Sequence, residues 1–277
     1  MPQQQHATAL MQQPAARARA GWRQSVVLWR YWLAREWKTR YAGSALGALW
    51  AVIQPVAMLG IFYVLFGHIL AIRIPGLETS GGYLLYLLAG LVVWLPFVDA
   101  VGRGVGCLVA HEDFLRKQPI PAEILPSVAV GSTLPTFVVG YALFLLICRV
   151  KGVGVYPSWA YLPLLLVAQV VLTMGMTFLL SMANFLWRDV GAGVVFVLQL
   201  WFYLTPIVYP MAQVPERFHA WFLLNPVACL ILALQASVLH LPMPNGTLWA
   251  LLAWVLLIGG GGWWFFRSMK SALGEAL

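Results

Sequence analysis

Long apolar segments separated by short polar connections set the pattern of this chain. Six of these segments have about the 20 residues that a helix needs to cross a bilayer. The connections leave no room for a second domain. The pattern therefore predicts an all-α polytopic membrane protein with a single six-helix transmembrane domain at residues 46–267. The expected helices cover residues 46–72, 83–102, 126–148, 161–183, 193–209 and 247–266.

A further apolar run, residues 218–240, contains no Asp, Glu, Lys or Arg, but Asn225-Pro226 interrupts it. As a helix, the 14 residues 227–240 would rise only about 21 Å, which is short of the roughly 30 Å hydrocarbon core. We therefore predict an extracytoplasmic re-entrant hairpin at about residues 213–240, with Asn225 and Pro226 at its break. Irregular backbone at membrane depth must be buried in protein or face a wet cavity, so such a hairpin would lie over a pathway or an interface. A seventh crossing is the alternative.

The 17 Lys and Arg residues are distributed unevenly, with seven of them before residue 41. If the N-terminus is cytoplasmic, six crossings place 13 of them inside and four outside, whereas seven crossings give 11 and six. The positive-inside rule favours the first arrangement, with both termini in the cytoplasm. The partner of the net charge of +8 is then anionic lipid and not nucleic acid. Six residues join the seven inside, namely Arg103, Arg116, Lys117, Arg188, Arg267 and Lys270, and the outside group is Arg73, Arg149, Lys151 and Arg217.

The two ends of the chain flank this domain. Residues 1–21 lack a continuous apolar core, so we expect a flexible cytoplasmic tail there and another at residues 268–277. Residues 22–41 predict an amphipathic helix in the cytoplasmic membrane interface, although Arg30 borders its apolar stripe and Arg40 rotates onto it. A plain juxtamembrane anchor without a role in coupling is the alternative. The stripe consists of Trp22, Val26, Trp29, Leu33 and Trp37.

Motifs for catalysis are missing from the sequence, which has no phosphate-binding loop, no zinc-protease motif and no nucleophile elbow. We therefore expect no catalytic residue, no metal site and no cofactor in this chain. Cys107, Cys148 and Cys229 lack metal-ligand spacing, and we assign them to packing. Asp99 is the one acid within a predicted span, and Arg103 follows it at i+4. A structural ion pair and a role in the transport pathway are both open for these two residues.

Aromatic residues are abundant, with 14 Trp, 14 Phe and 10 Tyr. Most of them are expected in lipid-facing belts and in packing. The other reading is that some rings line a conduit for sugars, because sugar C–H faces stack on aromatic surfaces while Tyr and Trp polar atoms meet hydroxyl groups. The candidates for such channel or substrate contacts are Phe62, Tyr63, Trp201 and Tyr203.

Three stretches carry a family resemblance: "RYAGSALGALWAVIQPVAM", "RKQPIPAEILP" and "NFLWRDVGAGVVFVLQLWFYLTPIVYPMAQVPERFHAWFLLNPVACLI". In this order and spacing they resemble the membrane permease subunits of ABC exporters for bacterial surface polysaccharides, which include O-antigen, capsule and teichoic-acid permeases. The resemblance implies a homodimer with two separate ATPase subunits, which bind ATP and Mg²⁺. Periplasmic export partners are a further implication. The departures from the family pattern are Leu234-Gln235 after the Asn-Pro and Gln118-Pro119-Ile120 near residue 120.

The resemblance also implies roles for individual residues. In that family a cytoplasmic coupling helix docks on the ATPase, and here it corresponds to about residues 107–121. The stretch between helices 5 and 6, residues 218–240, corresponds to the extracytoplasmic re-entrant helices of that family, which agrees with the hairpin predicted above. The residues assigned to coupling are Phe114, Leu115, Arg116, Lys117, Pro121, Arg188 and Asp189.

The resulting expectation is a permease subunit that moves a lipid-linked surface polysaccharide across the cytoplasmic membrane, driven by a partner's ATP hydrolysis. An exporter of small lipophilic molecules would share this fold and coupling but would need no continuous polymer conduit. A membrane-embedded transferase would need clustered carboxylates or histidines, and the nine acids of this chain are scattered. The chain is therefore expected to be a transporter subunit and not an enzyme.

Overall fold

The computed structural model describes residues 22–40, 47–50, 53, 57, 61, 64, 65, 69, 76, 77, 81–117 and 120–276. No strand occurs in this part of the chain, which agrees with the all-α prediction. The longer helices are α2 (Trp22–Arg40), α4 (Gly82–Val105), α8 (Leu134–Val150), α9 (Leu162–Leu186), α10 (Asp189–Tyr203) and α12 (Pro226–Leu239). The shorter ones are α5 (Cys107–Ala110), α6 (Glu112–Lys117), α7 (Ile124–Gly131), α11 (His219–Phe222), α13 (Thr247–Trp254), α14 (Gly261–Ser268) and α15 (Lys270–Ala276).

Four helical stretches are long and apolar enough to cross a membrane, namely residues 82–105, 124–150, 157–186 and 247–268. They confirm four of the expected spans. The expected fifth span is represented by α10, a shorter apolar helix that begins at Asp189 and ends at Tyr203 instead of running to residue 209. It stops there because Pro206 has no N–H to donate and its ring would collide with the preceding turn. The expected first span, residues 46–72, lies mostly outside the described residues.

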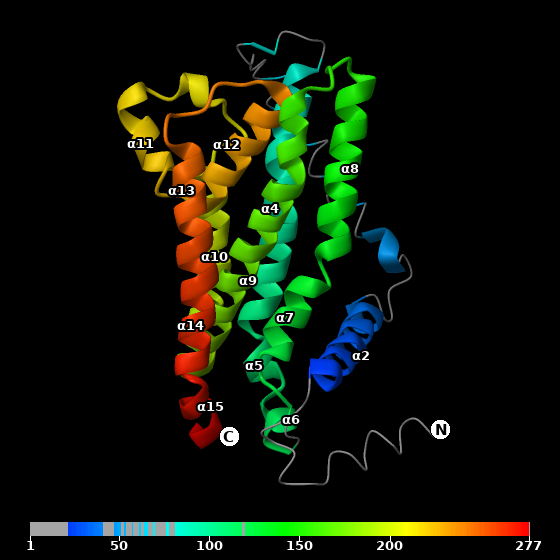
Figure 1. Cartoon of the computed structure of the whole chain (residues 1–277), viewed down its shortest axis with the longest axis vertical. Coiled ribbons are helices and arrows are strands. Elements are labelled where there is room, and N and C mark those ends of the chain that lie inside the picture. The colour runs from blue at the N-terminus through cyan, green and yellow to red at the C-terminus, as the bar shows by residue number, and fades with distance from the viewer. Residues whose placement is uncertain are drawn as a thin grey trace.

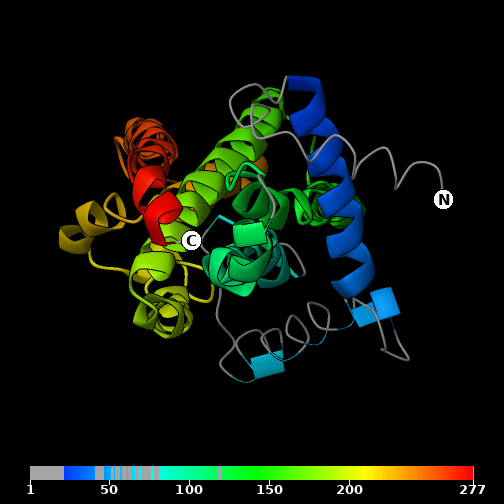
Figure 2. The same ribbon diagram turned by 90° about the horizontal axis from the view of Figure 1, so that it is seen from below.

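The helices α4, α8, α9 and α13–α14 run along the long axis of the molecule (Figure 1). The segments α5, α6 and α15 lie at one end, and α11 lies at the other end together with the connection between α12 and α13 (Figure 1). The helix α2 runs across the long axis beside the first of these ends (Figure 2). We call the end with α5, α6 and α15 the basal end and the end with α11 the distal end.

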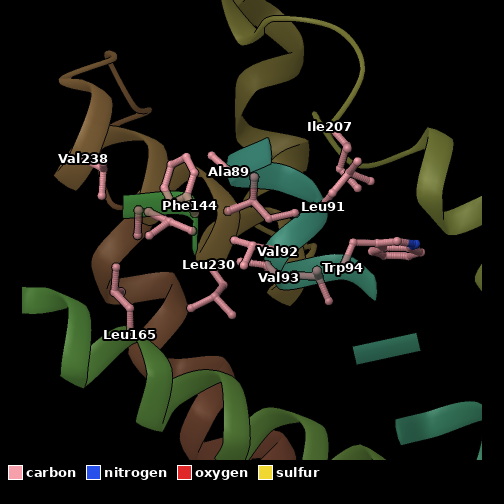
Figure 3. Close-up of a cluster of buried hydrophobic side chains, with 14 of the residues drawn as sticks. Ala89, Leu91, Val92, Val93, Trp94, Phe144, Leu165, Ile207, Leu230 and Val238 are labelled. Carbon is pink, nitrogen blue, oxygen red and sulfur yellow. The ribbon is translucent and has the colours of Figure 1, made fainter. Parts of the chain in front are cut away.

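Two hydrophobic clusters form the interior. The larger one joins α4, α8, α9, α10 and α12, and Figure 3 shows part of it around α4. The smaller one lies at the basal end and joins α2, α5, α7, α9, α14 and α15. Within the expected C-terminal tail, residues 270–276 form the helix α15, and Leu273 of this helix is buried in the smaller cluster.

Glycines allow α9 and the last span to touch through their backbones. A Cβ atom at Gly175 of α9 would overlap the carbonyl oxygen of Ile258, and a Cβ atom at Gly262 would overlap the carbonyl oxygen of Gly175. Small residues permit this kind of close helix approach in membranes. A π-helical segment, Val255–Gly260, lies between α13 and α14 at the same crossing.

The predicted break at Asn225-Pro226 is present. Residues 216–222 and 226–239 form two helical arms that bend by 111° at this point. Asn225 caps α12, because its side-chain Oδ1 accepts hydrogen bonds from the backbone N–H groups of Val227 and Ala228 at 3.1 and 3.0 Å. Pro226 takes the first position of the helix, where its missing N–H costs nothing.

Candidate functional site

The segment expected to be one coupling helix, residues 107–121, forms two short helices at the basal end. The helices α5 and α6 are separated at His111, whose ring Nδ1 lies 2.9 Å from the carbonyl oxygen of Cys107. Pro121 follows α6, and its carbonyl oxygen accepts a hydrogen bond from Ile124 N at 3.1 Å at the start of α7. The segment is therefore interrupted at His111.

Trp32 of α2 anchors this segment. Its side chain is only 4% exposed, and its ring makes edge contacts with Phe114 at a centroid distance of 4.9 Å and with His111 at 5.2 Å. Phe114 and Leu115 pack against the smaller cluster and are partly buried. Their side chains therefore hold the segment against the transmembrane domain. Three side chains of α6 are exposed, those of Asp113, Arg116 and Lys117. The side chain of Glu112 is half-buried.

Charged contacts tie the segment to the start of α10. Glu112 accepts hydrogen bonds from Arg116 Nη2 at 2.7 Å and from Arg188 Nη2 at 3.2 Å. Arg188 immediately precedes α10, and Asp189 lies in its first turn, where a negative charge is favourable. Arg116 and Arg188, which the sequence analysis assigned to coupling, are therefore neighbours in space. Along the chain, 72 residues separate them.

A four-residue charge cluster links α2 to the end of α4. Asp99 Oδ2 accepts hydrogen bonds from Arg103 Nη2 at 3.0 Å and from Arg40 Nη2 at 2.8 Å. Arg103 Nη1 also donates to Glu36 Oε1 at 3.2 Å. The expected i,i+4 pair is confirmed, and it is part of a larger cluster with two positive and two negative members. Arg40, which did not fit the apolar stripe, lies there because it meets Asp99.

A second charge contact joins the last helix to the exit of the segment. Lys270 Nζ of α15 donates to Glu123 Oε1 at 2.6 Å. The other carboxylate oxygen of Glu123 is buried and has no hydrogen-bond partner among the described residues. The basal end therefore gathers α2, α6, α7, α10 and α15 around one short segment.

The cysteines belong to the packing of the helices. Cys148 and Cys229 are buried in the larger cluster, and Cys107 packs against the smaller one. All three are free thiols. Burial raises the pKa of the Cys107 thiol, and the carboxylate of Glu36 raises it further. This thiol is therefore held in its neutral, unreactive form.

The aromatic channel candidates have different surroundings. Phe62 and Tyr63 lie outside the described residues. Trp201 is partly buried and makes edge contacts with Phe97 at 5.8 Å and with Trp94 at 6.3 Å. Tyr203 is 62% exposed. The packing role is therefore evident for Trp201, whereas Tyr203 is available to a ligand or to lipid.

Two sets of residues were missed by the sequence analysis. Trp32 was left out of the α2 stripe although it is the most buried described side chain of that helix. The hydroxyl groups of Tyr83 and Tyr86 on α4 donate to backbone carbonyls more than 100 residues away. Their spacing of three residues on one helix face is a signal in the sequence. The spacing does not identify the carbonyl partners, which only the fold brings near.

The apolar helices long enough to cross a bilayer identify an integral membrane protein. The sequence model of the ABC-2 type transporter family matches residues 27–239, so this chain belongs to that family. Membership in a transporter family places it among membrane transport proteins and not among enzymes.

Several curated proteins are similar to the chain over most of its length. The O-antigen export system permease protein RfbA of Myxococcus xanthus is 28% identical over 248 residues, which cover 88% of this chain and 92% of that protein. An O-antigen export system permease protein RfbA of Klebsiella pneumoniae is 28% identical and covers 77% of this chain and 79% of its own length. The polysialic acid transport protein KpsM of Escherichia coli is 25% identical, with 76% and 80% covered.

Proposed function

We propose that this chain is the membrane permease subunit of an ABC exporter that moves a lipid-linked surface polysaccharide across the bacterial inner membrane. The observation that carries the proposal is the match to O-antigen export permeases along 88% of this chain and 92% of the relative. A match of that extent includes the basal segment, the apolar helices and the distal hairpin together. The polysialic acid transport protein adds a second relative whose name refers to a polysaccharide.

The proposed topology has six crossings with both termini in the cytoplasm. The described spans alternate in direction between the basal and distal ends (Figure 1). The helices α2 and α15 both lie toward the basal end, as an even number of crossings requires (Figure 1). The excess of 13 positive residues over four on the other side supports a cytoplasmic basal end.

The distal hairpin is proposed to be re-entrant. Its two arms bend by 111° at the break, and α11 lies at the same end as the connection between α12 and α13 (Figure 1). A continuous crossing would instead place these two segments at opposite ends. The hairpin then covers the outer mouth of the pathway, because irregular backbone at membrane depth needs protein or a wet cavity around it.

The proposed energy input enters at the basal end. A separate ATPase subunit binds ATP and Mg²⁺, and two such subunits serve a homodimer of this chain. The exposed surface of α6, with Asp113, Arg116 and Lys117, together with the adjacent Arg188 and Asp189, forms the docking surface for that subunit. The helix α6 packs on Trp32 of α2 and follows α4 through α5. Displacement of the docking surface would therefore move both α2 and α4 as rigid bodies.

The substrate pathway is proposed to lie along α10 and the first span. Tyr203 is the described candidate for contact with sugars, since its ring is exposed. Periplasmic export partners would receive the polymer at the distal end.

The direct test is reconstitution of this chain with its ATPase subunit in vesicles that carry a fluorescent lipid-linked polysaccharide. ATP should drive the polymer across the membrane, and an ATPase variant unable to hydrolyse ATP should abolish transport. In cells, deletion of the gene should remove the polysaccharide from the surface and leave it inside. ATP-driven movement of a small lipophilic dye without polymer transport would instead support the exporter of small molecules. Processing of a sugar lipid without any ATPase would support a transferase.

A further inference from the structure

The connection after α10, residues 205–209, lies on the distal half of α4. Tyr83 Oη donates a hydrogen bond to the carbonyl oxygen of Val208 at 3.1 Å. Tyr86 Oη lies 2.7 Å from the carbonyl oxygen of Tyr209 and 2.9 Å from that of Pro206. Each tyrosine on α4 therefore holds backbone of the connection through its hydroxyl group, and Tyr86 holds it at two points.

A glycine on the same face of α4 lets the connection approach closely. Ile207 is fully buried, and Figure 3 shows it beside the part of α4 that carries Ala89 and Leu91. A Cβ atom at Gly90 would lie 2.8 Å from Ile207 Cγ2 and 3.2 Å from Ile207 Cα, so a larger residue would force the connection away. Residues 83, 86 and 90 share one helix face because they are three and four positions apart. We call Tyr83, Tyr86 and Gly90 the α4 seat.

The other side of the connection is attached to the hairpin. Asn225, which caps α12, donates from Nδ2 to Thr205 Oγ1 at 3.0 Å. The hydroxyl of Thr205 in turn donates to the carbonyl oxygen of Trp201 in α10 at 2.8 Å. The connection is thus held between the α4 seat and the start of the second hairpin arm.

Gln235 of α12 lies beside the Tyr86 hydroxyl. Its side chain is 2% exposed and is close enough to interact with that hydroxyl, although its Nε2 makes no hydrogen bond of full geometry among the described residues. The amide therefore adds α12 to the elements that surround Tyr86.

The far end of α4 leads directly to the basal segment. The helix has 24 residues and is about 36 Å long. Its last turns carry Asp99 and Arg103, which pair with α2, and α5 begins at Cys107. One buried helix therefore touches the proposed ATPase-facing segment at one end and the hairpin connection at the other.

We propose that the α4 seat couples the hairpin to motion of α4, with Tyr86 as its main positioning residue. This inference rests on the proposed function for its meaning in transport. Movement of the basal segment shifts α4, the seat carries residues 205–209 with it, and Asn225 passes the shift to α12.

The test compares Tyr86→Phe with Tyr141→Phe, each in a Val208→Cys background that lacks the three native cysteines. Tyr141 is a matched control because its buried hydroxyl also makes a hydrogen bond, donating to Gln169 Oε1 at 2.9 Å between α8 and α9. Val208 lies in the connection and is only 5% exposed, so a cysteine there becomes accessible when the connection leaves α4. The assembled complex with its ATPase is labelled with a water-soluble maleimide, with and without ATP, and polysaccharide export is measured in parallel.

Loss of the Tyr86 hydroxyl should raise the resting labelling rate at position 208 by about two- to ten-fold, which is the range that one net hydrogen bond supplies. It should also reduce the ATP-dependent change in labelling and the amount exported per ATP hydrolysed. Tyr141→Phe should behave like the wild type in all three measurements. Wild-type labelling and export in Tyr86→Phe, or equal effects of the two variants, would overturn the proposal.

Gly90→Ala provides an independent arm if Tyr86→Phe does not assemble. Its Cβ atom would lie 2.8 Å from Ile207 Cγ2 and would force the connection away from α4, so resting labelling at position 208 should be faster than in the wild type. Slower or unchanged labelling would count against the proposal. Labelling requires no polysaccharide, so coupling through the α4 seat and polysaccharide export are tested separately. If the wild-type complex exports no polymer but the variants show these labelling shifts, the proposed function is refuted and the coupling through the α4 seat is supported.

Discussion

Phe114→Ala should release the basal segment from α2. The helix α6 has only six residues, which is too short for a helix to be stable alone, so contacts with the rest of the protein must hold it. Phe114 supplies one such contact through its edge packing on the buried ring of Trp32. Complete burial of a Phe side chain contributes about 1.5–3 kcal/mol, and an aromatic pair adds about 0.5–1.5 kcal/mol.

Because Phe114 is partly buried, about half of the burial contribution applies. Together with the aromatic pair this gives about 1.3–3 kcal/mol, and about 1–2.7 kcal/mol remains after the better helix propensity of Ala subtracts a few tenths. A loss of that size favours local opening of α6 by about 5- to 100-fold. The backbone N–H groups of Phe114 and Leu115, which donate to His111 O at 3.1 and 3.0 Å, would lose protection.

Hydrogen exchange measured by mass spectrometry on the reconstituted complex checks this directly. Peptides that cover residues 112–117 should exchange faster in Phe114→Ala by about the factor above, whereas peptides from the middle of α9 should not change. Tyr31→Ala is the matched control, because Tyr31 is next to Trp32 on α2 but its side chain is exposed and should not hold the segment. Unchanged exchange in Phe114→Ala would show that the Trp32 contact does not hold the segment, and the reasoning would be wrong.

Three further outcomes are expected. In a cysteine-free background, Asn245→Cys should react with a membrane-impermeant maleimide from the periplasmic side; labelling only after permeabilisation would establish a seventh crossing. Trp201→Ala should lower the free energy of unfolding by about 2–4 kcal/mol because its ring is packed. Tyr203→Ala should lower export without changing the free energy of unfolding, because its ring is exposed. Normal export by Tyr203→Ala would move that ring to the lipid-facing class. Gly175→Val should abolish stable expression, because a Cβ atom there overlaps Ile258 O; a well-folded variant would contradict the close crossing.

Local features of the chain were predictable from the sequence. The apolar lengths identified four spans that the described residues confirm. The Asn225-Pro226 pair predicted a break, and Arg103 at i+4 from Asp99 predicted an ion pair. Each of these depends on residues within a few positions of one another. The sequence therefore contains the whole cause, namely helix rise, the missing N–H of proline or the four-residue spacing.

The side of each helix that is buried in the protein depends on the tertiary structure. In a membrane, lipid tails are as apolar as leucine, so a helix is apolar on the side that faces lipid as well as on the side that faces protein. Hydrophobic periodicity then loses its power to identify the buried face. Trp249 and Phe266 illustrate this, because both belong to the last span and yet the first is 76% exposed and the second is fully buried.

The candidate sites depend on contacts between residues that are distant in the chain. Arg40 and Asp99 are 59 residues apart, and Tyr86 is 120 residues from the carbonyl group of Pro206. The sequence by itself determined a membrane protein, four of its apolar helices and the break at Asn225-Pro226. Only the tertiary structure decided that Trp32 anchors the basal segment and that α4 carries the seat for the hairpin. Such pairings require the packing of several helices at once, and no local pattern along a single helix encodes them.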